Sequence, residues 1–168
     1  MAGIPDLLLL LATCAPSVNI ATSAALVQIE SAGNPYAIAV VGAELQRQPR
    51  NLAEAIVTIR VLAADGWNFS VGLGQINQSN FDRLGVTAEA LLDPCTNLKA
   101  MEVVLTECFT RARAGGRGEQ AAVRAALSCY YSGNFSTGFR HGYVAKVVNA
   151  ATKSRRASMR IQTRVAAP

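Results

Sequence analysis

One long helical segment constrains the fold more than any other part of the sequence. Asp93-Pro94 marks its start, because proline is favoured at the first position of a helix, and Gly115-Gly116 marks its end. Between them, apolar side chains recur at the spacing of a buried helical face: Leu98, Met101, Leu105, Cys108, Phe109 and Ala112. A helix of this length favours a mainly α fold.

Shorter patterns of the same kind flank this segment. We expect helices over residues 5–14 (short and buried), from Thr22 or Ser23 to Gly33, from Asn51 to Asp65, over 75–84, over 119–131 and from about 142. Residues 36–44 read as an extended segment or loop, 67–74 as a loop or small hairpin, and 87–92 as a turn. The sequence therefore predicts one mainly α domain over residues 1–150, with at most a small β-hairpin. Residues 151–168 read as a basic, flexible tail.

Composition and charge narrow the class of protein. The chain has 168 residues, of which 51% are hydrophobic, enough for one domain with a sizeable core. A formal net charge of +5 favours anionic partners such as nucleic acid, anionic lipid or cell wall. Aromatic residues make up only 6% and do not alternate with basic ones, which argues against nucleic acid. The Leu7–Leu11 run is too short to span a bilayer and lacks a basic leader, so we expect any export signal to lie outside this sequence.

The four cysteines show no C-x-x-C spacing, and His141 is the only histidine, which argues against a zinc site. Cys95 and Cys108 lie on the long helix about 20 Å apart along its axis, so they cannot bridge each other. If two disulfides form, Cys14 and Cys129 each take one of that pair, and the spacing leaves both pairings open. Buried free thiols are the alternative, and an oxidising compartment favours at least one bridge.

Glu30 is the candidate catalytic residue. It follows Leu26 and Val27 by four and three residues, which puts its carboxyl on the face of two buried aliphatic side chains. An apolar setting near a helix C-terminus disfavours negative charge, so we expect a raised pKa for Glu30. A carboxyl that stays protonated near neutral pH can act as a general acid.

Two further stretches carry polar residues that local structure does not require. Gly72-Leu73-Gly74-Gln75-Ile76-Asn77 joins paired glycines, which permit close backbone approach to a ligand, to two amide side chains. Residues 126–134 end in Tyr130-Tyr131-Ser132-Gly133-Asn134, which brings aromatic hydroxyl groups to a glycine turn.

Taken in order, these motifs resemble those of the lysozyme-like lytic transglycosylases, whose hallmarks are E-S, G-L-x-Q-I and a Y-N-A-G-like turn. The resemblance runs from about Cys14 to Val148. It is closest to the family member attached to type IV secretion systems, because Asn34-Pro35, residues 93–98 and the Y-V-A-K-V sequence of residues 143–147 also match.

The resemblance implies a lysozyme-like helical fold around a glycan cleft. It implies cleavage of the β-1,4 bond between N-acetylmuramic acid and N-acetylglucosamine in peptidoglycan, without water, to leave a 1,6-anhydro end. It implies no metal or cofactor. The expected partners are glycan strands and type IV secretion components, in the periplasm or cell envelope.

The resemblance also assigns residues. Glu30 matches the catalytic acid, and the expected substrate-binding residues are Gln75, Tyr130, Ser31, Asn77, Tyr131 and Asn134. Tyr131 stands where the family commonly has asparagine, which bears on the role of Asn134, and Ala39 where many relatives have serine. Ser31 has an alternative role in bonding nearby backbone, and Asn77 one in capping the next helix.

Two other functions compete with this one. A true muramidase would need a second carboxylate about 5 Å or roughly 6.5–9.5 Å from the first, for which Glu44, Asp65 and Asp82 are candidates. A non-catalytic glycan-binding scaffold would use residues 36–70 and the basic tail to dock partners.

Overall fold

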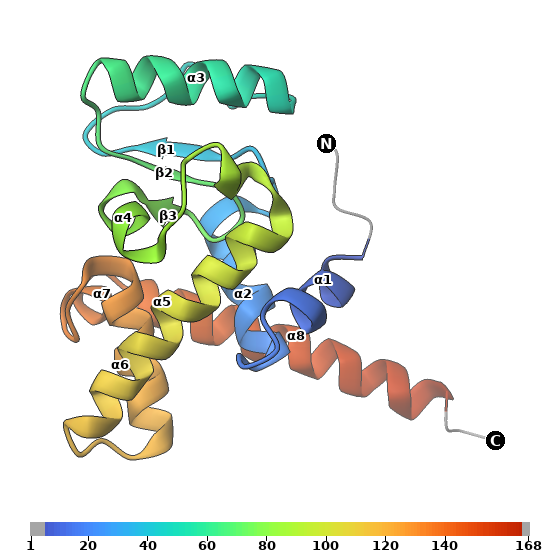
Figure 1. The fold of residues 1–168 in the computed structure, drawn as a ribbon. Helices are drawn as coiled ribbons and strands as arrows, with labels where there is room; N and C mark the ends of the chain where they lie inside the picture. Colours follow the sequence, from blue (N-terminus) through green and yellow to red (C-terminus); the bar gives the residue numbers. More distant parts are fainter. Residues whose placement is uncertain (1–5, 166–168) are drawn as a thin grey trace. The chain divides into compact units, whose positions relative to one another are not determined.

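The computed structural model describes residues 6–165, with side chains for residues 6–156. Residue 5 of the first expected helix and residues 166–168 of the expected tail lie outside this range. The elements in chain order are α1 (Leu7–Cys14), α2 (Ile20–Ser31), β1 (Ile38–Val40), α3 (Leu52–Ala64), β2 (Phe69–Val71), β3 (Ile76–Asn77), the 3-10 helix η1 (Gln78–Asn80), α4 (Phe81–Leu84), the 3-10 helix η2 (Ala90–Leu92), α5 (Pro94–Ala114), α6 (Glu119–Ser132), α7 (Thr137–Arg140) and α8 (Tyr143–Val165) (Figure 1). The predicted mainly α class is confirmed.

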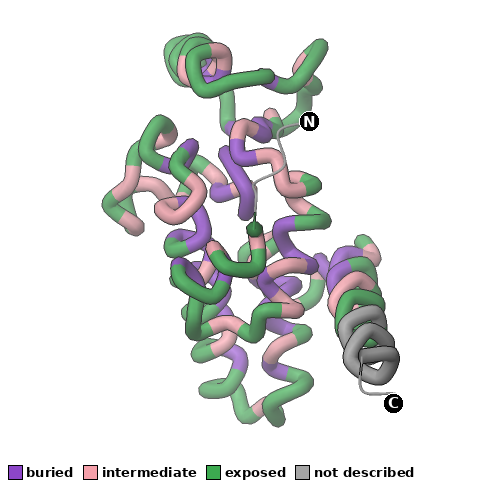
Figure 2. Tube along the Cα trace, turned by 90° about the vertical axis from the view of Figure 1, so that its right-hand side faces the viewer, coloured by how far each residue is buried: buried purple, intermediate pink, exposed green. Residues whose placement is uncertain are grey.

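The chain forms two compact units. The first contains the residues up to Ala15 together with Glu30–Met101, and the second contains Pro16–Ile29 together with the residues from Glu102 onward. Helices α2 and α5 each continue from one unit into the other. Buried and exposed positions alternate along the helices (Figure 2), as expected of amphipathic helices.

The sheet of the first unit is larger than the sequence predicts. Its three strands are antiparallel in the order β1-β2-β3, with Ile38 opposite Val71 and Val71 opposite Ile76. These three side chains are buried, which fixes the register because a one-residue slip would turn them outward. The prediction of one α-helix over residues 75–84 is wrong for its first part. The chain forms β3 and η1 there, and α4 begins only at Phe81.

A side chain covers the free edge of β1. The Gln48 amide accepts a hydrogen bond from the Ile38 N–H (2.8 Å) and donates one to the Ile38 carbonyl (2.9 Å). These are the two bonds that a neighbouring strand residue would make. Gln48 therefore satisfies backbone groups that an edge strand otherwise leaves open.

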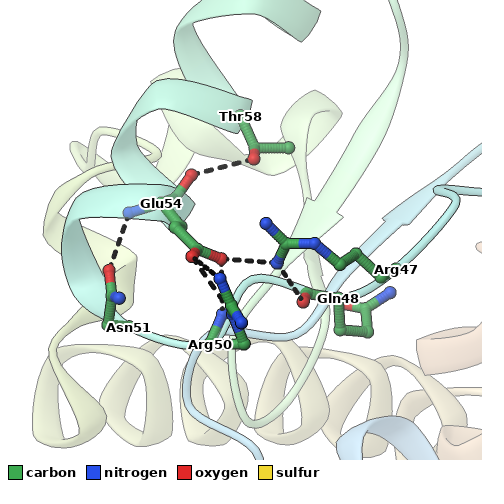
Figure 3. A network of polar contacts seen from close by, with 6 residues as sticks. All are labelled: Arg47, Gln48, Arg50, Asn51, Glu54 and Thr58. Atoms are coloured by element: carbon green, nitrogen blue, oxygen red, sulfur yellow. Dashed lines mark hydrogen bonds and ion pairs between the residues drawn. The ribbon is translucent and has the colours of Figure 1, made fainter.

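Helix α3 is capped by Asn51, the residue at which the expected helix begins. The Asn51 side chain accepts a hydrogen bond from the Glu54 N–H (2.9 Å). The Glu54 carboxylate accepts from the Arg50 N–H and pairs with the guanidinium groups of Arg47 (2.6 Å) and Arg50 (3.0 Å) (Figure 3). These hydrogen bonds, first from Arg47 and then from Arg50, lower the pKa of Glu54 to about 2.

The first two helices differ in detail from expectation. Helix α1 forms, with Asp6 accepting a hydrogen bond from the Leu9 N–H, but it is only partly buried: Leu8 and Leu9 are 57% and 62% exposed. Helix α2 begins at Ile20, so neither Thr22 nor Ser23 is its cap. Asn19 takes that position, since its side chain accepts from the Ala21 N–H (3.0 Å).

In the second unit, α6, α7 and α8 pack against one another (Figure 1). Gly138 of α7 lies so close to α6 that an added Cβ would stand 2.7 Å from the Ser128 Cα. The Ser128 hydroxyl accepts a hydrogen bond from the Gly138 N–H (2.9 Å) and donates one to the Asn134 carbonyl. Helix α8 continues to Val165, so most of the segment assigned to the tail is helical.

Each unit contains one disulfide. Cys14 bridges to Cys95 in the first unit, and Cys108 bridges to Cys129 in the second. The prediction that Cys95 and Cys108 take different partners is confirmed, and the structure selects one of the two pairings that the sequence leaves open.

Candidate functional site

Glu30 lies in the last turn of α2, in the first unit. It is half-buried, and Leu26 and Val27 on the same face are fully buried. The chain leaves the helix through Ala32 and Gly33, whose φ angles are 51° and 78°. The predicted place of Glu30 in the last turn of a helix, after two buried aliphatic residues, is confirmed. Its catalytic role stays a prediction.

Ser31 forms a bond to the backbone that follows it. Its hydroxyl oxygen accepts a hydrogen bond from the Gly33 N–H at 3.2 Å. One of the two roles expected for Ser31, stabilisation of the helix end, is therefore present. Asn34 continues the turn, with its side chain accepting from the Tyr36 N–H (2.9 Å).

Gln75 occupies a strained backbone position in the loop between β2 and β3, with a φ angle of 50°. Its Nε2 donates hydrogen bonds to the carbonyls of Ala37 (2.9 Å) and Gly72 (3.0 Å). Both amide hydrogens are therefore used to hold the loop against the segment that follows α2. The Oε1 atom is the group that could accept a hydrogen bond from a sugar.

Asn97 anchors this loop from α5, a role that the sequence analysis does not predict. The side chain is 1% exposed; it donates to the carbonyls of Val71 (2.9 Å) and Leu91 (2.8 Å) and accepts from the Gly74 N–H (2.8 Å). Gly72 makes room for it, since a Cβ there would stand 2.1 Å from Asn97 Nδ2. The signal that could have revealed this contact is a polar residue in the first turn of a proline-started helix, directly before the buried-face residue Leu98.

Asn77 acts as a cap. Its Oδ1 accepts from the Ser79 N–H (3.0 Å), and its Nδ2 donates to the side chains of Asn68 (2.9 Å) and Ser70 (3.1 Å). The expected alternative role, capping the following helix, is confirmed for η1. The sugar contact stays a prediction.

Three aromatic side chains gather at the end of α6 in the second unit. Tyr131 is 44% exposed and stacks on the buried Tyr143, with ring centroids 4.5 Å apart. Its hydroxyl lies 3.1 Å from His141 Nδ1. Tyr130 is half-buried at the preceding position. Tyr130 and Tyr131 lie in the last turn of α6. The structure therefore places the exposed ring of Tyr131 directly before the glycine turn that the sequence predicts.

Asn134 shapes the turn after α6. Its Oδ1 accepts hydrogen bonds from the backbone N–H groups of Ser136 (3.0 Å) and Thr137 (2.8 Å). Gly133, with a φ angle of 75°, permits the reversal. Asn134 therefore has a structural role at the start of α7, and its contact with substrate stays a prediction.

The expected site residues are divided between the units. Glu30, Ser31, Gln75 and Asn77 belong to the first, while Tyr130, Tyr131 and Asn134 belong to the second. The three carboxylates considered for a muramidase, Glu44, Asp65 and Asp82, are all exposed.

Among the side chains of residues 6–156, no three His, Cys, Asp or Glu residues are grouped so that they could hold a metal ion. Within residues 6–165, none of the helices combines the length and the apolar character needed to cross a membrane.

The chain matches the family model described as the transglycosylase SLT domain over residues 9–150. The type IV secretion system protein virB1 of Brucella abortus (strain 2308) is 50% identical over 150 residues, which cover 86% of this chain and 63% of that protein. The protein virB1 of Agrobacterium fabrum (strain C58) is 40% identical over 143 residues, 82% of this chain and 56% of that protein. This chain thus spans less than two thirds of the length of these relatives. No solved structure is significantly similar to it. The match over most of its length shows that the chain belongs to the transglycosylase SLT domain family.

Proposed function

We propose that this protein is a peptidoglycan lytic transglycosylase that cleaves the β-1,4 bond between N-acetylmuramic acid and N-acetylglucosamine and leaves a 1,6-anhydro end. The observation that carries the proposal is the family match, which includes the E-S, G-L-G-Q-I and Y-Y-S-G-N motifs. The half-buried position of Glu30 beside Leu26 and Val27 supports a role as general acid.

In this proposal a single carboxyl transfers a proton twice. Protonated Glu30 donates to the glycosidic oxygen as the bond to the muramic acid C1 breaks. The resulting carboxylate then removes the proton from the C6 hydroxyl of the same sugar, and that oxygen attacks C1. Because the attack is intramolecular, its effective molarity is high, and neither water nor a second enzyme nucleophile is required. The N-acetyl group can stabilise the developing cation.

We expect the residues of the three sequence motifs to contact the glycan. Gln75 Oε1 would accept a hydrogen bond from the sugar, while Ser31 and Asn77 would line the same ligand as secondary contacts. Tyr130, Tyr131 and Asn134 would contact the glycan from the end of α6. We further propose that the protein acts in the cell envelope, with type IV secretion components as partners, where it opens the wall locally. The names of the virB1 relatives support this assignment.

Product masses test the reaction. Purified peptidoglycan is digested with the wild-type protein, with Glu30→Gln and with the matched controls Glu44→Gln and Asp82→Asn. We expect anhydro-ended muropeptides from the wild type and both controls, and a rate about 10²–10⁴-fold lower for Glu30→Gln with glycan binding retained.

Other outcomes would contradict the proposal. Reducing ends, with loss of activity in one of the control variants, would indicate a muramidase. Wall binding without released muropeptides from the wild type would indicate a non-catalytic scaffold. Normal turnover by Glu30→Gln would remove Glu30 from the mechanism.

A further inference from the structure

Two guanidinium groups of the second unit share one aromatic ring. The Arg117 Cζ lies 4.8 Å and the Arg111 Cζ 5.4 Å from the ring centroid of Phe135. A third arginine, Arg113, donates a hydrogen bond to the Arg117 carbonyl (2.8 Å). We call Arg111, Arg113, Arg117 and Phe135 the arginine cluster.

The loop between α5 and α6 is shaped around this cluster. Gly115 allows Arg117 to fold back, because a Cβ at residue 115 would stand 3.0 Å from Arg117 Nη1. Phe135 is held from behind, where it packs against the buried residues Ala112, Ala122 and Ala125. The ring is thus a fixed platform for the two cations.

The cluster has no direct ion pair among the side chains that the structure describes. Over residues 6–156, no ion pair within 4.0 Å involves Arg111, Arg113 or Arg117. Like charges held on one ring repel each other, and a bound anion would relieve that repulsion. The flat donor edges of arginine suit a carboxylate, which they can bind with two parallel hydrogen bonds.

The position of the cluster along α6 indicates which anion it binds. Arg111 Nη1 lies 3.7 Å from the Sγ of Cys129, next in sequence to Tyr130, and Phe135 directly follows Asn134. The ring packs beside Ala122 and Ala125, so it lies roughly 8–12 Å along the helix from Tyr130. A peptide of three or four extended residues spans about 10–14 Å.

We infer that the arginine cluster binds the carboxylates of the peptide stems carried by the glycan strand. This inference rests on the proposed function, because it takes the end of α6 to contact the sugars from which the stems extend. The cluster would then favour wall regions whose stems carry free carboxylates over stripped glycan.

Binding measurements in the Glu30→Gln background test this inference without turnover. The probes are soluble glycan strands that carry peptide stems, and the same strands after an amidase has removed the stems. We expect Arg111→Gln/Arg117→Gln to raise the Kd for stem-bearing strands about tenfold and to change the Kd for stripped strands less than about twofold. The control Arg124→Gln/Arg140→Gln removes the same charge from exposed positions outside the cluster and should leave both values unchanged.

A second measurement does not depend on the folding of a variant. Amidation of the stem carboxylates should weaken binding to the protein with an intact cluster by a similar factor. Equal losses for both strand types, an equal loss in the control variant, or unchanged binding of amidated stems would overturn the inference. So would unchanged stem binding by Arg111→Gln/Arg117→Gln with loss of binding to phosphatidylglycerol vesicles, which would assign the cluster to lipid.

The proposed function fails separately. If product masses show no cleavage while stem-dependent binding persists, the cluster stands and the catalytic assignment is lost. If cleavage to anhydro ends is normal and binding is independent of the stems, the catalytic assignment stands and the cluster does not bind stems.

Discussion

At the scale of single residues, the buried side chain of Asn97 in α5 holds the backbone of the loop that carries Gln75. Its amide hydrogen-bonds three backbone groups: the Val71 carbonyl and the Gly74 N–H, which lie before Gln75, and the Leu91 carbonyl of η2. Buried backbone groups that lose their partners cost free energy comparable to a lost hydrogen bond each. The geometry of the Gln75 loop therefore depends on a residue that need not touch substrate.

We expect Asn97→Leu to lower the free energy of unfolding by about 3 kcal/mol, because the Gly74 N–H and the carbonyls of Val71 and Leu91 would be left unpaired. Urea denaturation measures the loss. Lys99→Ala, an exposed change two residues further along α5, is the control and should cost less than about 0.5 kcal/mol. A similar stability for Asn97→Leu and the control would show that the loop does not depend on this amide.

The sequence identifies which residues are polar at the turns, but not which atoms are already engaged. Asn77 and Asn134 fall in motifs of the family, yet the Asn77 side chain caps η1 and the Asn134 side chain binds backbone N–H groups at the start of α7. A side chain can cap a helix only if the backbone turns into that helix directly after it. At Asn77 the sequence predicts a position inside a helix over residues 75–84, so the start of η1 at Gln78 could not be predicted. Asn97 was missed for the converse reason, because its partners lie 6 to 26 residues away in the chain.

At the scale of elements, helix α3 is held by charge at its first turn. Glu54 joins the helix to Arg47 and Arg50 in the preceding loop (Figure 3). The pKa of Glu54 is lowered in the folded state, so its contribution to stability is fully present above the ordinary carboxyl pKa of about 4.5. That contribution is lost as the pH falls towards about 2.

Glu54→Gln should therefore lower the Tm at pH 7 by roughly 1–3 °C, a small effect because the network is largely exposed. The difference between the two proteins should shrink progressively from about pH 4.5 downward and disappear near pH 2. Thermal unfolding followed by circular dichroism across this range measures it. A Tm difference that is independent of pH would exclude an ionic origin.

The contact between α6 and α7 depends on a glycine. We expect Gly138→Ala to destabilise the protein by about 1–3 kcal/mol, because the new methyl group would meet the Ser128 backbone rather than a movable side chain. Calorimetry of Gly138→Ala beside Gly118→Ala, where nothing lies within 4 Å of the added atom, would measure it. Equal unfolding temperatures would mean that α7 can shift away from α6 at no cost.

At the scale of the whole molecule, the two disulfides close loops of different length. The sequence separations are 81 residues for Cys14–Cys95 and 21 for Cys108–Cys129. If loop entropy dominates, these correspond to about 4.5 and about 3.3 kcal/mol of stabilisation. Cys14→Ala/Cys95→Ala should then unfold at a lower denaturant concentration than Cys108→Ala/Cys129→Ala. The reverse order would show that local packing, not loop length, sets the contribution.

Helices α3, α5 and α6 could be predicted because apolar residues recur at helical spacing along each of them and a glycine follows the end of each. The sheet could not, since strands of two or three residues carry too little pattern, and their pairing depends on contacts distant in sequence. Helix α1 was predicted as buried from its leucines, but a run of leucines surrounds a short helix on all sides, and Leu8 and Leu9 face solvent. The place of Glu30 at the end of α2 could be predicted because its pattern is local to one helix, and its catalytic role stays a prediction.

The amide of Gln48 has a consequence for how copies of this protein meet at high concentration. Because Gln48 already occupies the N–H and carbonyl of Ile38, a strand of a second molecule cannot pair with β1 at that residue. Replacing Gln48 with alanine would leave the Ile38 N–H and carbonyl of the short strand β1 open to pairing with a neighbouring molecule.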